Sequence, residues 1–569
     1  MNKKISLYDI FGLSILIIQG ILLVLNYDNI VSNQKDWPYH LMIARMFVDR
    51  SSILWDFYEY APIGRPNLYP PFLHSLFAVS NIMGMGWVTI QKFYGILMYL
   101  VSLFVVWFVS RDLFGKKVGA LSILVLSLST EYWYWQISIA PTSIIFGVFP
   151  LVIWAAYREK TKISIALLTI CLWSHFSSFL IVIALLTFAA IKREYLKKTL
   201  KIICISLLLY SPWAIHVLMN IEWFNSYSAM GGVNRMELIP LLFGIPGILF
   251  MLRRRDTKDI LILSTIPSIL LIGVLYGSRL SVHAPVMFAL ISAIGIFEIF
   301  RRINSKIVGV AIITLIAISF IGNPTFSIKD GHQIGKTPLN IQVMPVAGAQ
   351  HLDENVSSYY QNSTRNNNGL LPPPREMNDQ MIPEDAAQYF TRNVTSYAQN
   401  KPDQSTRGLP QRNLLSIDET PLLNEINSLL GSNNSKLQQS GYLSEDAFAL
   451  YEYISSNTSS DEIIHVDSTF LSCVISLFTD RRTDNGMWKE VSSGNQQKSL
   501  ENIKIGISEI SGNGGNGPGG MNRISEESII AQFGQFVVYD VTKTNISNSE
   551  IPRIPMQGKS EGNISTINI

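Results

Sequence analysis

Long apolar runs separated by short polar clusters fill the chain up to Ile321. Eleven of these runs are candidate membrane spans, although several are shorter than the ~20 residues that a spanning helix usually needs. After Ile321 the composition shifts to Asn, Ser, Gln, Gly and Pro. The pattern therefore predicts an α-helical polytopic membrane domain over residues 1–321, followed by a soluble part. The predicted spans are 8–27, 88–109, 118–132, 139–157, 162–174, 176–191, 199–218, 237–252, 259–276, 280–299 and 307–321.

Lysine and arginine residues gather in six clusters between these runs. Positive clusters mark the cytoplasmic face, and eleven spans place all six there if residues 71–85 form an interfacial helix instead of a crossing. We therefore expect a multi-pass cell-membrane protein with a cytoplasmic N-terminus, an external loop over 28–87 and an extracellular C-terminal part. The clusters are Lys3–Lys4, Arg111 with Lys116–Lys117, Arg158–Lys162, Lys192–Lys201, Arg253–Arg255, and Arg301–Arg302 with Lys306.

The soluble part divides into two predicted regions. Residues 322–440 show little periodicity and many polar residues, which predicts a loosely ordered external segment. Residues 441–569 predict a small external α/β domain with a flexible tail. Its helices are expected at 445–455, with Ser444 as N-cap, and at 470–478. Its strands are expected at 463–466, 503–510 and 536–541.

Composition excludes several classes of protein. The net charge is only +3 over 569 residues, and no basic stripe carries interleaved aromatic residues, so nucleic acid is not expected as a partner. The three cysteines are Cys171 and Cys204 in apolar runs and Cys473 in the soluble part. Cys473 therefore has no disulfide partner in that part, and no CxxC metal motif is present.

An acid and a histidine follow the first span directly, in the sequence Asp36-Trp37-Pro38-Tyr39-His40. Asp36 is the candidate catalytic base that accepts a proton from an acceptor hydroxyl; the alternative is a helix N-cap. His40, one turn later, is expected to bind phosphate or to hold a metal together with Asp36. The alternative for His40 is an ordinary histidine at the membrane interface.

Five further residues reach the same external face in the predicted topology. Glu131 is a candidate second catalytic acid, and its alternative is a solvated carboxylate in an aromatic interface belt. Arg279 is a candidate phosphate ligand because guanidinium binds phosphate bidentately. The alternative is that its side chain only snorkels to the membrane surface. Arg65, His74 and His175 are candidate substrate contacts. For the two histidines, the alternatives are snorkelling at the interface and a satisfied core histidine respectively.

The order of these features resembles the GT-C class of membrane glycosyltransferases, which use polyprenyl-phosphate-linked sugars. Asp36–His40 is similar to the Asp-x-x-Tyr-His loop of archaeal oligosaccharyltransferases. Tyr69–Phe72 resembles the Tyr-Pro-Pro element of protein mannosyltransferases and arabinosyltransferases, and Arg111–Gly115 and Glu131 also fit the class. The soluble part lacks the Trp-Trp-Asp signature, and a lone Glu131 replaces a second acid pair. Both departures argue against en bloc oligosaccharide transfer.

The resemblance implies inverting transfer of a hexose or pentose from a polyprenyl-phosphate donor, such as dolichol phosphate, on the external face. Its acceptor would be a glycan or protein, as in protein glycosylation or cell-envelope assembly, and the resemblance and Ile-rich spans suggest an archaeal source. A divalent metal, Mg²⁺ or Mn²⁺, at Asp36 and His40 is the candidate cofactor, and metal dependence stays open. The alternative is a non-catalytic membrane scaffold or a transporter with the same helical frame. A transporter should show charged groups at mid-membrane and paired halves, and the sequence shows neither.

Overall fold

The structure, a computed structural model, describes residues 5–31, 36–137, 139–224, 235–275, 280–302, 340–342, 442–487, 503–509, 524 and 526–544. Internal contacts divide the chain into a unit of residues 1–345 with 439–569 and a unit of residues 346–438. All described residues belong to the first unit. The predicted span 307–321 and nearly all of the predicted segment 322–440 lie outside the described residues.

Each predicted span from 8–27 to 280–299 coincides with one or two helices, which confirms the polytopic helical fold. The predicted span 118–132 ends early, because α5 stops at Ser127 and a separate short helix begins at Thr130. The helices are α1 (Leu7–Val31), α4 (Trp87–Phe114), α5 (Lys116–Ser127), α6 (Thr130–Ile137), α7 (Thr142–Tyr157), α8 (Thr161–Leu172), α9 (Phe179–Ile191), α10 (Leu196–Met219), α11 (Leu238–Arg254), α12 (Thr257–Leu263), α13 (Thr265–Leu275) and α14 (Leu280–Arg302).

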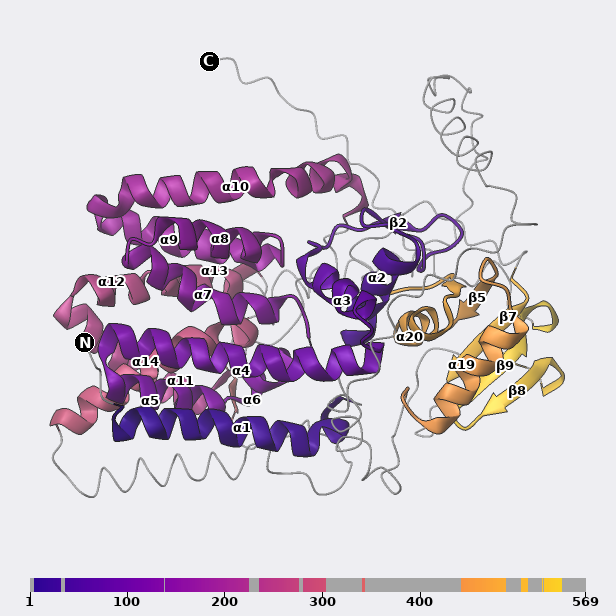
Figure 1. The fold of residues 1–569 in the computed structure, drawn as a ribbon, viewed down its shortest axis with the longest axis horizontal. Coiled ribbons are helices and arrows are strands. Elements are labelled where there is room, and N and C mark those ends of the chain that lie inside the picture. Colours follow the sequence, from indigo (N-terminus) through magenta and orange to yellow (C-terminus); the bar gives the residue numbers. More distant parts are fainter. Residues whose placement is uncertain are drawn as a thin grey trace, which may run out of the picture. The chain divides into compact units, whose positions relative to one another are not determined.

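Four of the described helices are long and apolar enough to cross a membrane: Leu7–Leu25, Trp87–Phe114, Arg193–Met219 and His283–Arg302. The remaining apolar helices are shorter and pack beside these. Figure 1 shows α1, α4, α7, α8 and α10 as a row of nearly parallel helices, and each of these helices contacts the next. Most residues in the apolar stretch of α14 are buried, whereas only 28% are buried in those of α1 and α10, as expected of helices whose apolar side chains face lipid.

Two glycines let α11 and α14 pack with their backbones in close contact. A Cβ atom on Gly247 of α11 would lie 2.1 Å from the carbonyl oxygen of Ile291, and one on Gly295 of α14 would lie 2.2 Å from that of Phe243. Only glycine permits this approach of the two backbones. Any larger side chain at either position would force α11 and α14 apart.

The basic clusters meet at one end of the helices. Ion pairs there connect the ends of α4, α7, α11 and α14 with the starts of α1, α5 and α10. Arg254 lies over the ring of Phe114. Five of the six predicted clusters belong to this network, while Lys3 and Lys4 lie outside the described residues. A common end is what the positive-inside prediction requires. The pairs are Arg111–Asp9, Lys116–Asp9, Arg158–Asp112, Lys198–Glu159, Arg254–Glu298 and Arg301–Glu298.

The segment between α1 and α4 folds as a compact loop. It contains α2 (Trp37–Asp49), the antiparallel strands β1 (Trp55–Asp56) and β2 (Arg65–Pro66), and α3 (Phe72–Ile82). The helix predicted at 71–85 is thus present as α3, started by its prolines. The first amide of α3 donates to the carbonyl of Trp173, at the end of α8, over 3.0 Å. This contact holds the loop against the helical bundle.

The C-terminal part forms the predicted small α/β domain. Its sheet has the strand order β6-β5-β7-β9-β8, with β5 parallel to β6 and β7, and β9 antiparallel to β7 and β8. Ser444 caps α19 as predicted, its hydroxyl accepting from the amide of Ala447 at 3.2 Å. Two described strands, β6 and β8, were not predicted. The elements are α19 (Glu445–Asn457), β5 (Ile463–Val466), α20 (Thr469–Thr479), β6 (Arg482–Thr483), β7 (Ile505–Glu509), β8 (Ile529–Phe533) and β9 (Phe536–Asp540).

A further pair of short strands joins distant parts of the chain. Strand β3 (Arg235–Glu237) pairs antiparallel with β4 (Asn340–Gln342), so three residues of the segment predicted to be loosely ordered form a strand. Short 3-10 helices complete the described secondary structure. They are η1 (Phe176–Ser178), η2 (Arg193–Tyr195), η3 (Ile221–Trp223), η8 (Glu526–Ser528) and η9 (Val541–Lys543).

Candidate functional site

Two histidines predicted from separate motifs lie against each other. His40 on α2 and His74 on α3 are almost fully buried, and the Nδ1 atom of His40 lies 3.0 Å from the Nε2 atom of His74. Their rings stack with centroids 5.2 Å apart. One of these two nitrogens must donate and the other accept, so the facing pair shares a single proton. The pair fixes α2 against α3.

Tyr69 brings a third histidine to this pair. Its ring lies 5.4 Å from His40, 5.8 Å from His74 and 5.6 Å from His175, measured between centroids. His175 is half-buried and immediately precedes η1, where its Nδ1 atom accepts from the amide of Ser177 at 3.0 Å. The structure thus gathers three predicted substrate contacts around one tyrosine, which we call the histidine cluster (His40, His74, His175 and Tyr69).

Asp36 immediately precedes α2 and is half-buried, whereas the first residues of the helix after it are buried. Its side chain makes no capping hydrogen bond to α2. Its backbone carbonyl accepts a long bond, 3.4 Å, from the amide of His40. The N-cap alternative is therefore not realised through the carboxylate. Asp36 lies one helical turn from the histidine cluster.

The metal site at Asp36 and His40 stays a prediction. Within the part of the chain that the structure describes, no three residues among His, Cys, Asp and Glu are grouped so as to hold a metal ion. The Nδ1 atom of His40, one of the two predicted ligands, lies 3.0 Å from the Nε2 atom of His74. We therefore derive no step through a metal at these two residues.

Arg65, a predicted substrate contact, is buried beside two carboxylates. Its guanidinium is 2% exposed and forms ion pairs with the carboxylates of Glu59 and Asp56, the latter at 3.3 Å. Glu59 also accepts from the Cys473 thiol at 2.8 Å and from the Met487 amide at 2.9 Å. Burial raises the pKa of Glu59 to about 8, although Arg65 acts in the opposite direction. This geometry favours a structural role for Arg65 over the predicted phosphate contact.

The same contacts tie the α/β domain to the first loop. The amide of Thr483 donates to the carbonyl of Tyr58 at 2.8 Å, and the amide of Ala61 donates to the carbonyl of Thr483 at 2.9 Å. The hydroxyl of Tyr58 bonds the carboxylate of Asp480 at 2.5 Å. Helix α20 packs on α2, the helix that carries His40. The α/β domain therefore stabilises the loop that carries Asp36, His40, Tyr69 and His74.

Sequence reasoning missed this buried acid–arginine group (Asp56, Glu59, Arg65 and Cys473). Three charged residues within ten positions of this loop were the available signal.

Two other predicted site residues cannot be placed relative to the histidine cluster. Glu131 belongs to α6, but its side chain is not among those described, and Arg279 lies outside the described residues.

No protein-family model matches this chain, and no curated protein matches it. Solved structures do resemble it. ArnT from Cupriavidus metallidurans bound to undecaprenyl phosphate aligns with a TM-score of 0.50 at 13% identity, covering 92% of this chain and 97% of that one. The oligosaccharyltransferase AglB from Archaeoglobus fulgidus, in complex with an inhibitory peptide and a dolichol-phosphate, aligns with a TM-score of 0.49 at 12% identity, covering 89% and 70%. The chain has a GT-C-like fold, as the sequence resemblance predicted.

Proposed function

We propose that this protein is a membrane glycosyltransferase that moves a sugar from a polyprenyl-phosphate donor to an acceptor on the external face of the membrane. The observation that carries the proposal is the position of Asp36. It is a half-buried acid on the loop after the first long apolar helix, one turn from a buried pair of histidines. The undecaprenyl phosphate bound in the ArnT structure supports a polyprenyl phosphate as the lipid part of the donor.

In the proposed reaction Asp36 accepts the proton of an acceptor hydroxyl. The acceptor oxygen then attacks the anomeric carbon, and the bond from that carbon to the phosphate oxygen breaks. Polyprenyl phosphate leaves with the bonding electron pair, and the sugar configuration inverts. Either a hexose or a pentose satisfies this scheme, and the acceptor is a glycan or a protein.

The leaving phosphate is the group that needs stabilisation, because negative charge develops on it as the bond breaks. We assign this role to Arg279, whose planar guanidinium matches two phosphate oxygens. His175 is half-buried at the edge of the histidine cluster and supplies a further contact to substrate. His40 and His74 are buried more deeply, and their mutual hydrogen bond holds α2 and α3 together beside the proposed site. Glu131 remains the proposed second acid.

Replacing Arg279 with lysine should lower kcat/KM, because the charge stays but the planar fork is lost. Replacement with alanine should cost more, about 1.5–3 kcal/mol of transition-state stabilisation, or on the order of ten- to a hundredfold. The measurement is steady-state transfer by the purified variants. Arg255→Ala is the matched control, since Arg255 is exposed and its side chain bonds only the nearby carbonyl of Leu252 among the described contacts.

A direct binding assay separates phosphate recognition from other effects at Arg279. The parent protein should bind polyprenyl phosphate more tightly than Arg279→Ala, and Arg255→Ala should bind like the parent. Equal affinity of the parent and Arg279→Ala would mean that Arg279 only snorkels to the membrane surface. The phosphate would then be sought at His175 or His74.

We also expect residues 322–569 to be external and the basic clusters to be cytoplasmic, because the Lys and Arg count permits only this orientation of eleven spans. Protease added to intact cells should remove the C-terminal part, which an epitope tag on that end would report. Survival of the tag in intact cells, with cleavage only after permeabilisation, would show that the orientation is inverted.

A further inference from the structure

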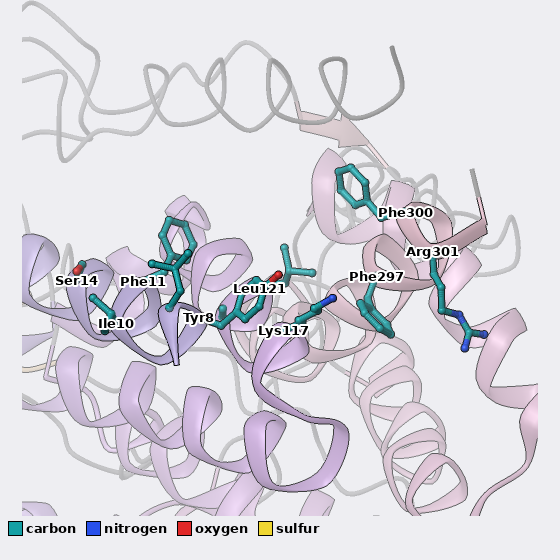
Figure 2. A pocket seen from close by; sticks show the side chains of 11 residues that line it. Tyr8, Ile10, Phe11, Ser14, Lys117, Leu121, Phe297, Phe300 and Arg301 are labelled. Atoms are coloured by element: carbon teal, nitrogen blue, oxygen red, sulfur yellow. The ribbon is translucent and has the colours of Figure 1, made fainter. Parts of the chain in front are cut away.

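A cavity of about 820 Å³ lies between the first turns of α1, the start of α5 and the end of α14 (Figure 2). Its walls are mainly apolar and include Ile10 and Phe11 of α1, Leu121 of α5 and Phe297 of α14. Exposed apolar side chains continue from it along α1, where Ile17 is 61% and Ile18 47% exposed. Such a surface is stable only against lipid or another apolar partner.

Two cations complete the lining of the cavity. Lys117 and Arg301 are both exposed, and Lys117 lies 5.5 Å from the ring of Tyr8, which also lines the cavity. Figure 2 shows the amine of Lys117 and the guanidinium of Arg301 on either side of Phe297. One ligand with an apolar body and an anionic head would match both parts of this lining.

The nearby acids do not cancel these charges. Asp9 is buried and already paired with Arg111 at 2.5 Å and Lys116 at 3.3 Å. Glu298 pairs with Arg301 at 2.7 Å, but it also pairs with Arg254 at 3.6 Å. Arg302 also lies 3.9 Å from Glu298. Each acid is therefore shared among two or three cations, and the polar end of the cavity carries excess positive charge.

We propose that this cavity binds an anionic phospholipid, with its acyl chains along the apolar wall and its phosphate between Lys117 and Arg301. Juxtamembrane Lys and Arg residues attract anionic lipid by about 1 kcal/mol each, and the excess positive charge here favours an anionic over a zwitterionic head. The site differs from the proposed catalytic one. Helix α1 has 25 residues, about 37 Å at 1.5 Å per residue, and it separates the cavity from Asp36 beyond its other end.

Native mass spectrometry of the purified full chain with dioleoylphosphatidylglycerol or dioleoylphosphatidylcholine tests this proposal. The parent protein should prefer dioleoylphosphatidylglycerol by about thirtyfold, the size expected from two juxtamembrane cations at about 1 kcal/mol each. The double variant Lys117→Gln/Arg301→Gln should lose that preference. The matched control Lys162→Gln/Arg255→Gln removes two exposed cations that do not line the cavity and should keep it.

A second variant tests the apolar wall without touching the charges. Ser14→Phe adds a ring inside the cavity and should reduce binding of both lipids. The proposal would be overturned if the Lys117→Gln/Arg301→Gln variant kept the preference for dioleoylphosphatidylglycerol. It would also be overturned if the matched control lost that preference equally, because this would indicate a general effect of surface charge. Equal and weak binding of both lipids to the parent would show that another part of the chain fills the cavity, and would also overturn it.

Discussion

The Asp36→Asn variant should lose sugar transfer by about 10²- to 10⁴-fold, the contribution of a general base, while it folds and inserts normally. Asparagine keeps the size of the side chain but cannot take a proton at neutral pH. The carboxylate of Asp36 does not cap α2, so the substitution removes no capping bond. The measurement is turnover of a polyprenyl-phosphate sugar by purified protein in lipid vesicles.

Asp49→Asn is the matched control for Asp36→Asn. Asp49 ends the same helix, α2, and its carboxylate forms a partly exposed ion pair with Arg45 at 2.6 Å. Loss of such a pair costs about 0–1 kcal/mol, so this variant should transfer sugar almost normally. Near-normal turnover by both variants would remove Asp36 as the base. Absence of turnover by the parent protein as well would instead favour a scaffold or transporter.

Replacing Arg65 with methionine should destabilise the protein by about 3–5 kcal/mol, because it leaves Asp56 and Glu59 buried without a counter-charge. Both carboxylates are at most 1% exposed. Thermal unfolding of the purified protein measures the loss. Arg50→Met is the control, since the Arg50–Asp480 pair at 3.3 Å is partly exposed and should contribute about 0–1 kcal/mol.

A double variant distinguishes the structural role of Arg65 from the predicted phosphate contact. Adding Glu59→Gln to Arg65→Met removes one uncompensated carboxylate and should restore part of the lost stability. If Arg65→Met instead unfolds at the same temperature as the parent protein but fails to transfer sugar, the predicted phosphate contact is correct and the structural role is wrong.

Helix positions and the start of the α/β domain could be predicted because their signals are local. Apolar runs locate α4 and α10 to within a few residues, and Ser444 marks the first residue before α19. The Asp36 and His40 motif could also be recognised, since both residues belong to one helical turn. These features depend on neighbouring residues and can therefore be predicted without knowledge of the tertiary fold.

Features that depend on distant contacts could not be predicted. Glu59 and Cys473 are 414 positions apart, and nothing in either local sequence indicates that they meet. Strand β6 has only two residues, too few for an alternating pattern, and β8 is an edge strand with no alternation of buried and exposed residues. The sequence placed His40, His74 and His175 on the same face, but only the structure brings them around Tyr69.

The most direct test of the account is the fate of the donor. Purified protein in vesicles is supplied with a panel of radiolabelled hexosyl and pentosyl polyprenyl phosphates and with cell-envelope extract as acceptor. For one donor, the account predicts that polyprenyl phosphate is released in equal amount to the sugar transferred, and that both products disappear in Asp36→Asn. Release and transfer that continue unchanged in Asp36→Asn would contradict it, as would the absence of turnover by the parent protein with every donor.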